Sequence, residues 1–320
     1  MAQAKMSTIR IQGVDKPVTR LIMGSMMLHV DRMEHASELL DAYVAAGGNA
    51  FDTAHCYGPA GMKAIGRWMR ERNNRESLAI IGKGAHPYGD GPRMTRSFME
   101  QDLDESLACL QTDHVDVYML HRDDPDTPVG YILESLNELL ASGRCRALGV
   151  SNWTTARLEE ANAFAASRGL IGFACNSPNL SLAKPNEPRW HGCVSADADY
   201  IAWHRQSRLP LLSWSSQAGG FFTGRFSPDK LDDPEAVRVY YSEANWERLR
   251  RARQLAESKG CDANQVALAY VLGQSFPTCA IIGPNSPEEL RSSLQGLGIA
   301  LSAEEAAWVD LAAPQDAALQ

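Results

Sequence analysis

The chain has 320 residues, 44% of them hydrophobic and 22% charged, which is the composition of a globular protein rather than a disordered or collagen-like chain. The 39 acidic residues outnumber the 31 basic ones, and the formal net charge of −8 argues against a nucleic-acid-binding protein. The sequence has no apolar run of about 18 residues, which argues against a membrane protein. The first ten residues lack the apolar core of a signal peptide.

Seven cysteines are spread through the chain without any CxxC pair: Cys56, Cys109, Cys145, Cys175, Cys193, Cys261 and Cys279. Neither a disulfide framework nor a cysteine-rich zinc site fits this odd number and this spacing. We therefore expect reduced thiols, most of them buried, in a cytoplasmic protein.

Short apolar runs recur along the chain, and most are followed by an amphipathic stretch. In chain order the eight runs are Leu21–Met23, Ala50–Phe51, Leu78–Ile81, Val115–Leu120, Cys145–Val150, Leu170–Cys175, Leu209–Leu212 and Cys279–Ile282. The starts of most consecutive runs lie roughly 30 residues apart, which is the length that one strand and its crossover helix need. Continuous apolar strands are typical of a parallel sheet that is covered on both faces.

The stretches between these runs have the patterns of amphipathic helices. Near the C-terminus, Ser286 is followed by a proline and, three positions after the serine, by Glu289, which are features of a helix start. Eight strand-helix units predict an α/β fold, a (β/α)8 TIM barrel with long loops at its C-terminal rim. An open, doubly wound parallel sheet is the alternative.

Three segments fall outside the repeat. Residues Ile9–Val18 are expected to form a hairpin that plugs the floor of the barrel. The long segments Ser177–Arg208 and Ala218–Tyr241 are expected to be lids over a functional site, with a simple surface insertion as the alternative. No linker marks a domain boundary, so we expect one domain over residues 1–320.

The chemistry of a barrel enzyme lies at the C-terminal ends of its strands. Three successive apolar runs are followed by Asp52, Lys83 and His121, and Tyr57 lies five residues beyond Asp52. Each residue alone has an ordinary explanation, because an aspartate can cap a turn, a lysine can be solvated and a histidine can belong to a charged turn. Their occurrence on three successive strands of one rim favours a common site.

These four groups suit acid-base chemistry. A tyrosine has a pKa near about 10, and a neighbouring lysine favours the phenolate and lowers that pKa. A carboxylate paired with the lysine keeps it charged, and a histidine can donate a hydrogen bond to a substrate oxygen. The set suits proton transfer to a carbonyl oxygen while another group delivers hydride to the carbon.

Several blocks resemble the aldo-keto reductase superfamily, and its bacterial branch most. They are FDTAHCYG (Phe51–Gly58), IIGKG (Ile80–Gly84), YMLHRDDP (Tyr118–Pro125), GVSNW (Gly149–Trp153), LLSWSSQAGGFFTGRF (Leu211–Phe226) and AIIGPNSPEELRSSL (Ala280–Leu294). The resemblance covers nearly the whole chain, in order. It implies a barrel that reduces carbonyl compounds with a nicotinamide cofactor, with Asp52, Tyr57, Lys83 and His121 as the catalytic tetrad and Tyr57 as the acid.

The same resemblance implies a cofactor site. Ser151, Asn152 and Asn176 match positions that bind the carboxamide, although glutamine is commoner than Asn176. Trp214 matches the aromatic residue that stacks on the nicotinamide. The other cofactor residues that it implies are Ser215, Ser216, Gln217, Gly219, Gly283, Asn285, Glu289 and Ser293.

The adenine end departs from the family pattern. Many relatives have a cation where Asn285 stands, and other residues are usual at Glu289 and Ser293. A carboxylate at Glu289 would repel a 2′-phosphate unless it serves the helix cap, whereas Arg225 and Arg291 could compensate. We expect NADP(H) as the cofactor, with NAD(H) as the alternative.

The substrate is expected to be a small carbonyl or hydroxyl compound, sugar-like compounds among them, and neither nucleic acid nor a membrane is an expected partner. The expected pocket residues are Met26, Met27, His55, Cys56 and Trp190, with packing against the barrel as the alternative for Trp190. No metal is expected, because no pair of histidines has zinc-like spacing. A nucleotide-binding regulatory barrel with little turnover, or a metal-dependent hydrolase, are the alternative functions.

Overall fold

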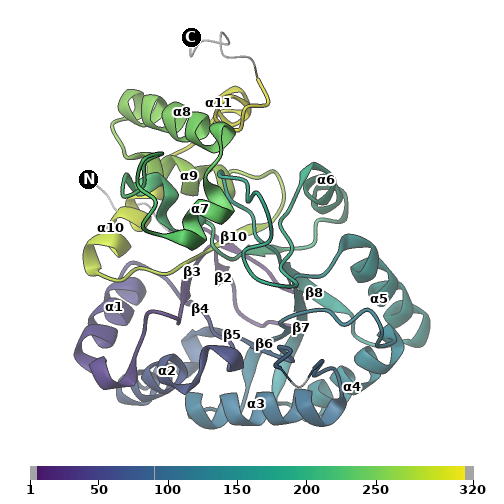
Figure 1. Ribbon diagram of the computed structural model, residues 1–320. Coiled ribbons are helices and arrows are strands. Elements are labelled where there is room, and N and C mark those ends of the chain that lie inside the picture. Colours follow the sequence, from purple (N-terminus) through teal and green to yellow (C-terminus); the bar gives the residue numbers. More distant parts are fainter. Residues whose placement is uncertain (1–5, 90, 314–320) are drawn as a thin grey trace.

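Eight parallel strands close into a barrel that helices surround (Figure 1) in a computed structural model that describes residues 6–89 and 91–313. Around the barrel the strands follow one another in the order β10-β3-β4-β5-β6-β7-β8-β9. Their bounds are β3 (Leu21–Gly24), β4 (Ala50–Asp52), β5 (Ala79–Gly84), β6 (Val115–Leu120), β7 (Cys145–Ser151), β8 (Phe173–Ser177), β9 (Leu211–Ser213) and β10 (Thr278–Ile282). Each predicted run contributes one strand, so the (β/α)8 barrel is confirmed and the open sheet is wrong.

The strands are buried on both faces, which explains their continuous apolar sequences. Ala50 and Ile81 belong to the cluster inside the barrel, whereas Phe51 and Ile80 pack outward against the helices. Side chains alternate along a strand. The next inward positions after Ala50 and Ile81 are therefore Asp52 and Lys83, at the upper ends of β4 and β5.

Eleven α-helices are present in the described residues. They are α1 (Met33–Ala45), α2 (Pro59–Arg72), α3 (Arg96–Leu110), α4 (Val129–Ala141), α5 (Thr155–Arg168), α6 (Ala198–Ser207), α7 (Pro234–Tyr240), α8 (Glu243–Lys259), α9 (Ala263–Leu272), α10 (Pro287–Gly296) and α11 (Ala303–Val309). The predicted start of α10 is confirmed, because the Ser286 side chain accepts a hydrogen bond from the Glu289 amide. The short 3₁₀ helices η2 (His55–Tyr57) and η4 (Ala218–Thr223) lie in loops of the C-terminal rim.

A short antiparallel hairpin closes the floor of the barrel, as predicted. It consists of β1 (Thr8–Ile9) and β2 (Val18–Thr19). Ile11, Val14 and Val18 pack into the same cluster as the inward-facing residues of the strands. The hairpin therefore supplies the apolar contacts that the open lower end of the barrel needs.

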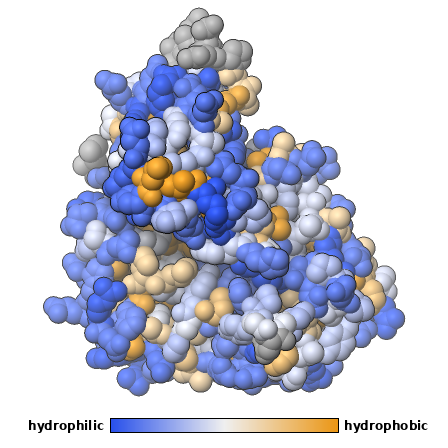
Figure 2. All heavy atoms as spheres, in the orientation of Figure 1, coloured by the Kyte–Doolittle hydropathy of each residue, from blue (hydrophilic) through white to orange (hydrophobic). Residues whose placement is uncertain are grey.

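The two long segments on the rim are partly folded. Ser177–Arg208 contains α6, and Ala218–Tyr241 contains η4 and α7. All seven cysteines are free and four of them are buried, as expected. In the orientation of Figure 1 the surface is mostly hydrophilic (Figure 2). No helix in residues 6–89 and 91–313 has both the length and the apolar sequence to cross a membrane.

The prediction of one domain over residues 1–320 stays a prediction, because residues 1–5 and 314–320 lie outside the described part of the chain. The expected absence of a signal peptide was argued from the first ten residues, and residues 1–5 of these lie outside the described part of the chain.

The floor of the barrel offers a test of the packing. Ile11 is 1% exposed, so we expect Ile11→Ala to lower the free energy of unfolding by about 2–5 kcal/mol through lost burial and the cavity it leaves. Ile171→Ala is the control, because Ile171 is 54% exposed and its loss should change stability by less than about 0.5 kcal/mol. Denaturant unfolding of both variants checks this. Equal losses of unfolding free energy in the two variants would contradict the packing role of the hairpin.

Candidate active site

A buried ion pair lies at the C-terminal ends of β4 and β5. The Lys83 ammonium donates to a carboxylate oxygen of Asp52 at 2.5 Å and to the carbonyl oxygen of Thr53 at 3.3 Å. Both side chains are almost completely buried. Burial raises the pKa of Asp52, and the positive charge of Lys83 opposes that shift. The two opposite charges thus satisfy each other within the barrel mouth.

Tyr57 and His121 lie beside this pair. The Lys83 ammonium is 5.4 Å from the centre of the Tyr57 ring, and the Tyr57 and His121 rings lie edge to face with centroids 5.6 Å apart. Tyr57 is in η2, in the loop after β4, and His121 directly follows β6. The barrel therefore brings all four residues of the predicted tetrad together.

The expected effect of Lys83 on the Tyr57 phenol does not match the structure. The pKa of Tyr57 is raised well above its ordinary value, first by burial and then by the negative charge of Asp52. In this state of the protein Tyr57 is a protonated phenol, which is the form that donates a proton.

His121 is held from several sides. Its ring nitrogen Nδ1 is 3.2 Å from the Cys56 sulfur, and its carbonyl oxygen accepts hydrogen bonds from Arg122 and Asn152. Burial, followed by the positive charges of Lys83 and Arg122, lowers the pKa of His121 well below its ordinary value. The imidazole is therefore neutral at physiological pH and carries one N–H group.

Arg122 is a supporting residue that the sequence analysis missed. Besides the carbonyl of His121, its guanidinium donates to the carbonyl of His191 and to the sulfur of Cys193. Arg122 thus fastens the segment after β8 to the end of β6. Its position next to His121 was visible in the sequence, but its partners about 70 residues away were not.

Two of the residues expected to bind the carboxamide are already engaged with the protein. The Asn152 amide donates to the Ser151 hydroxyl, and its oxygen accepts from the Val194 amide and the Trp214 indole. The Ser151 hydroxyl donates to the carbonyl of Ser177. Their role toward a cofactor stays a prediction. The structure adds that both side chains connect neighbouring segments of the rim through hydrogen bonds.

Asn176, the third of these residues, has an unused acceptor. Its amide nitrogen donates to the Tyr200 hydroxyl at 2.5 Å and lies 3.4 Å from the His204 ring, both on α6. Its oxygen is buried and hydrogen-bonds to no described residue. A buried unsatisfied carbonyl is costly, so this atom is suited to accept a hydrogen bond from an amide of a bound group.

Trp214 and Trp190 form the aromatic side of the mouth. Trp214 follows β9, and its ring packs against the cluster inside the barrel. The Trp190 ring lies 5.8 Å from it at an angle of 32°, with the Arg189 guanidinium 4.7 Å from the Trp190 ring centre. Trp190 is 42% exposed. A planar ligand could stack on this surface.

The loop after β9 makes a sharp turn with two guanidinium groups beside it. Positive φ angles occur at Ser215, Ala218, Gly219 and Gly220, so the backbone turns sharply there. Arg189 donates to the Ser215 hydroxyl, and Arg225 donates to the carbonyl of Gly219. Ser216 and Gln217 bind the neighbouring segments, through the Ile281 carbonyl and the Ser293 hydroxyl. The Arg189 guanidinium is also paired with the Glu235 carboxylate at 2.5 Å, so part of the positive charge beside this turn is already compensated.

The Glu289 side chain binds at the start of α10. One carboxylate oxygen of Glu289 accepts from the backbone amide of Asn285 at 2.7 Å and from its side-chain amide at 3.3 Å. The carboxylate thus binds at the start of the helix, to the amide one residue before the N-cap Ser286. The Asn285 amide that was expected to meet the cofactor is shared with this carboxylate. Gly283 is exposed and Ser293 is buried.

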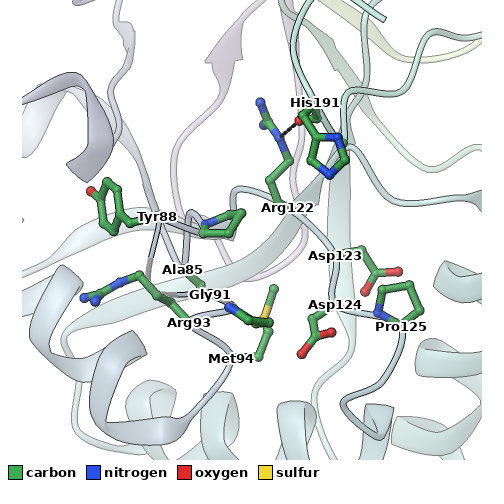
Figure 3. A pocket seen from close by; sticks show the side chains of 13 residues that line it. Ala85, Tyr88, Gly91, Arg93, Met94, Arg122, Asp123, Asp124, Pro125 and His191 are labelled. Carbon is green, nitrogen blue, oxygen red and sulfur yellow. Dashed lines mark hydrogen bonds between the residues drawn. The ribbon is translucent and has the colours of Figure 1, made fainter.

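A pocket of about 340 Å³ opens next to His121, between the loops that follow β5 and β6. Figure 3 shows Tyr88, Arg93 and Met94 on one side and Asp123, Asp124 and Pro125 on the other, with Arg122 turned toward His191. None of the expected pocket residues Met26, Met27, His55, Cys56 and Trp190 lines it. Their role in binding a substrate stays a prediction.

Metal-binding residues do not gather anywhere in residues 6–89 and 91–313: no group of three or more His, Cys, Asp or Glu side chains could hold an ion. The acidic and imidazole groups of the rim are instead hydrogen-bonded to the protein, as in the contacts of His55 with Glu105 and Tyr88.

The lowered pKa of His121 predicts how the site responds to pH. Because the folded protein favours the neutral imidazole, His121 should stay uncharged as the pH falls from 8 through about 6.5, where an ordinary histidine gains its proton. Below about pH 6.5 the unfolded chain gains this proton while folded His121 does not, so the free energy of unfolding should fall as the pH drops toward the lowered pKa of the folded state. Titration of the histidine ring signals by NMR checks this, with His121→Gln to assign the signal. A midpoint near 6.5 would contradict the burial argument.

The comparisons with known proteins agree with this geometry. The sequence profile of the Aldo/keto reductase family matches residues 20–313. An uncharacterized oxidoreductase, YrpG of Bacillus subtilis, is 30% identical over 90% of this chain and 90% of its own length. A norsolorinic acid reductase of Emericella nidulans is 29% identical over 88% of this chain and 73% of its own. A putative aryl-alcohol dehydrogenase of Saccharomyces cerevisiae is 26% identical over 92% and 79%. With its barrel and its assembled tetrad, the chain belongs to the aldo/keto reductase family.

Proposed function

We propose that the protein reduces an aldehyde or ketone to an alcohol with a nicotinamide nucleotide, or catalyses the reverse reaction, with Tyr57 as the general acid or base. The observation that carries this proposal is the assembly of Tyr57 between the Lys83–Asp52 pair and the His121 ring. A phenol, an imidazole and a buried ion pair at the end of a barrel suit proton transfer to one oxygen atom.

The residues present fit a nicotinamide cofactor. The unsatisfied oxygen of Asn176 suits the carboxamide, the Trp214 ring suits the nicotinamide face, and the loop from Ser215 to Gly220, with Arg189 and Arg225, suits the pyrophosphate. When bound, the nicotinamide supplies or accepts hydride. The protein's own residues then have to bind the substrate oxygen and move one proton.

The protein's part of the reduction follows from the charges. His121 donates a hydrogen bond to the carbonyl oxygen and holds it near the phenol. Tyr57 is protonated and gives its proton to that oxygen as negative charge develops there. The resulting phenolate is then stabilised by the Lys83 ammonium, whose own position is fixed by Asp52.

Aromatic carbonyl compounds are the substrate class that we propose first, with sugar-like carbonyls second. Tyr88 and Trp190 are each exposed by 42% at the mouth of the site, where they would contact an apolar ring. One of the relatives is named an aryl-alcohol dehydrogenase. The unpaired state of all seven cysteines agrees with a cytoplasmic location, which we also propose.

The assay that tests the proposal measures consumption of NADPH and of NADH by the purified protein against a panel of aromatic, aliphatic and sugar aldehydes and ketones. Turnover with any of them supports the reaction. Cofactor binding without turnover across the panel would instead support a regulatory barrel.

Tyr57→Phe tests the acid directly. The variant keeps the ring but cannot supply a proton, so turnover should fall by about 10²–10⁴-fold, the usual contribution of general acid catalysis. The dissociation constant of the cofactor, measured by fluorescence titration, should hardly change. Tyr131→Phe is the control, because Tyr131 lies on α4 and its hydroxyl binds the Arg96 amide. A Tyr57→Phe variant that keeps more than about a third of the activity would rule out this role.

Cofactor choice is the second test. We propose that both cofactors are used, with NADP(H) narrowly ahead, because Asn285 offers only neutral donors and Glu289 places a carboxylate beside them. Asn285→Arg should tighten NADPH by about ten- to a hundredfold, the value of one charge-assisted hydrogen bond, and leave NADH nearly unchanged. Both dissociation constants are measured for the wild type, for Asn285→Arg and for Asn285→Gln as control. A wild-type preference for NADPH above about a thousandfold would show that Arg225 or Arg291 grips the phosphate.

A further inference from the structure

The side chain of Cys56 contacts the imidazole ring of His121. Cys56 lies in η2 between His55 and Tyr57, and its sulfur is 3.2 Å from Nδ1 of His121. This is within hydrogen-bonding distance for sulfur. The contact joins the loop after β4, which carries the phenol, to the end of β6, which carries the imidazole.

Both partners of this contact are uncharged. Burial raises the pKa of the Cys56 thiol to about 11, so the sulfur keeps its proton at physiological pH. His121 is neutral for the reasons given above and has one N–H group and one bare nitrogen. A thiol proton and a bare ring nitrogen can therefore form an S–H···N hydrogen bond.

The other nitrogen of the ring is available to a ligand. Within residues 6–89 and 91–313, Nε2 of His121 hydrogen-bonds to no side chain or backbone group, whereas Nδ1 faces Cys56. If Nδ1 accepts the thiol proton, the ring proton lies on Nε2. If Nδ1 carried the proton instead, Nε2 would present a lone pair to the oxygen of a carbonyl substrate and would repel it.

We propose that Cys56 is a positioning residue that keeps His121 in the tautomer with its proton on Nε2, by donating its thiol proton to Nδ1. The proposal rests on the proposed carbonyl reduction, and it adds a residue whose effect on the reaction passes through His121. It concerns the hydrogen-bonding capacity of the thiol and no covalent chemistry of the sulfur.

Two substitutions separate the hydrogen bond from the volume of the side chain. Cys56→Ala removes the donor, and turnover should fall by about three- to tenfold, as expected for one neutral hydrogen bond, while the cofactor dissociation constant stays the same. Cys56→Ser replaces the thiol with a hydroxyl donor and should keep most of the turnover. Cys261→Ala is the control, since Cys261 is also half-buried but lies in the loop between α8 and α9.

A spectroscopic measurement tests the mechanism itself. The Nδ1 signal of His121 in ¹⁵N NMR should show a hydrogen-bonded acceptor in the wild type and in Cys56→Ser. In Cys56→Ala it should move toward a bare acceptor or a protonated nitrogen. Wild-type turnover in Cys56→Ala, equal losses in the alanine and serine variants, or an unchanged Nδ1 signal in Cys56→Ala would each overturn the proposal.

The spectroscopic arm also keeps this proposal separate from the proposed function. The Nδ1 signal is recorded on the protein alone, without cofactor or substrate. If no carbonyl compound is turned over, the proposed function fails, and the Nδ1 signal still decides whether Cys56 sets the tautomer of His121.

Discussion

The ion pair between Lys83 and Asp52 is the interaction on which the rest of the site depends. An ammonium and a carboxylate are expensive to bury, and they are tolerated here because they lie 2.5 Å apart. Removing one partner of such a pair typically costs about 3–5 kcal/mol, because the other charge is left without compensation. The barrel supplies the geometry, since β4 and β5 are neighbours: Asp52 pairs with Ile81, and Lys83 is the next inward-facing residue of β5 above it.

A second buried carboxylate fixes the strand end that carries Lys83. Asp102 on α3 is fully buried, accepts a hydrogen bond from Arg93 at 2.6 Å and accepts the backbone amide of Ala85 at 2.8 Å. Ala85 has a φ of 57°, a left-handed conformation that an alanine adopts only at a cost of roughly 1–2 kcal/mol. This hydrogen bond holds the chain in a sharp turn two residues after Lys83, and so helix α3 supports the chemistry at the rim.

The sequence predicted the barrel well because its strands are buried on both faces. Such strands appear as uninterrupted apolar runs, and only their limits were misjudged: the sixth begins at Phe173 rather than at Leu170, and the seventh at Leu211 rather than at Leu209. The meeting of Asp52, Lys83 and His121 was equally visible, because residues at the C-terminal ends of successive barrel strands lie at one rim.

What the sequence did not reveal depends on long-range contacts and on burial. The Asn152 side chain is engaged by Val194 and Trp214, 42 and 62 positions away, and no local pattern announces those partners. The pKa of Tyr57 depends first on how much water the surrounding loops remove and then on the negative charge of Asp52. Proximity alone suggested the opposite direction for that pKa.

The pKa shifts of Tyr57 and His121 have a common consequence for the chemistry that we propose. Burial raises the pKa of Tyr57 and lowers that of His121, so both groups are neutral at physiological pH and each carries a proton that it can share. Reduction of a carbonyl needs a proton donor and a hydrogen-bond donor at the developing oxyanion, and both are present without any prior ionisation. In the mechanism that we propose, oxidation of an alcohol would use the Tyr57 phenolate as base, and the same burial opposes its formation. The reduction that we propose therefore starts from the protonation states that burial favours, whereas the proposed oxidation would need the phenol to ionise first.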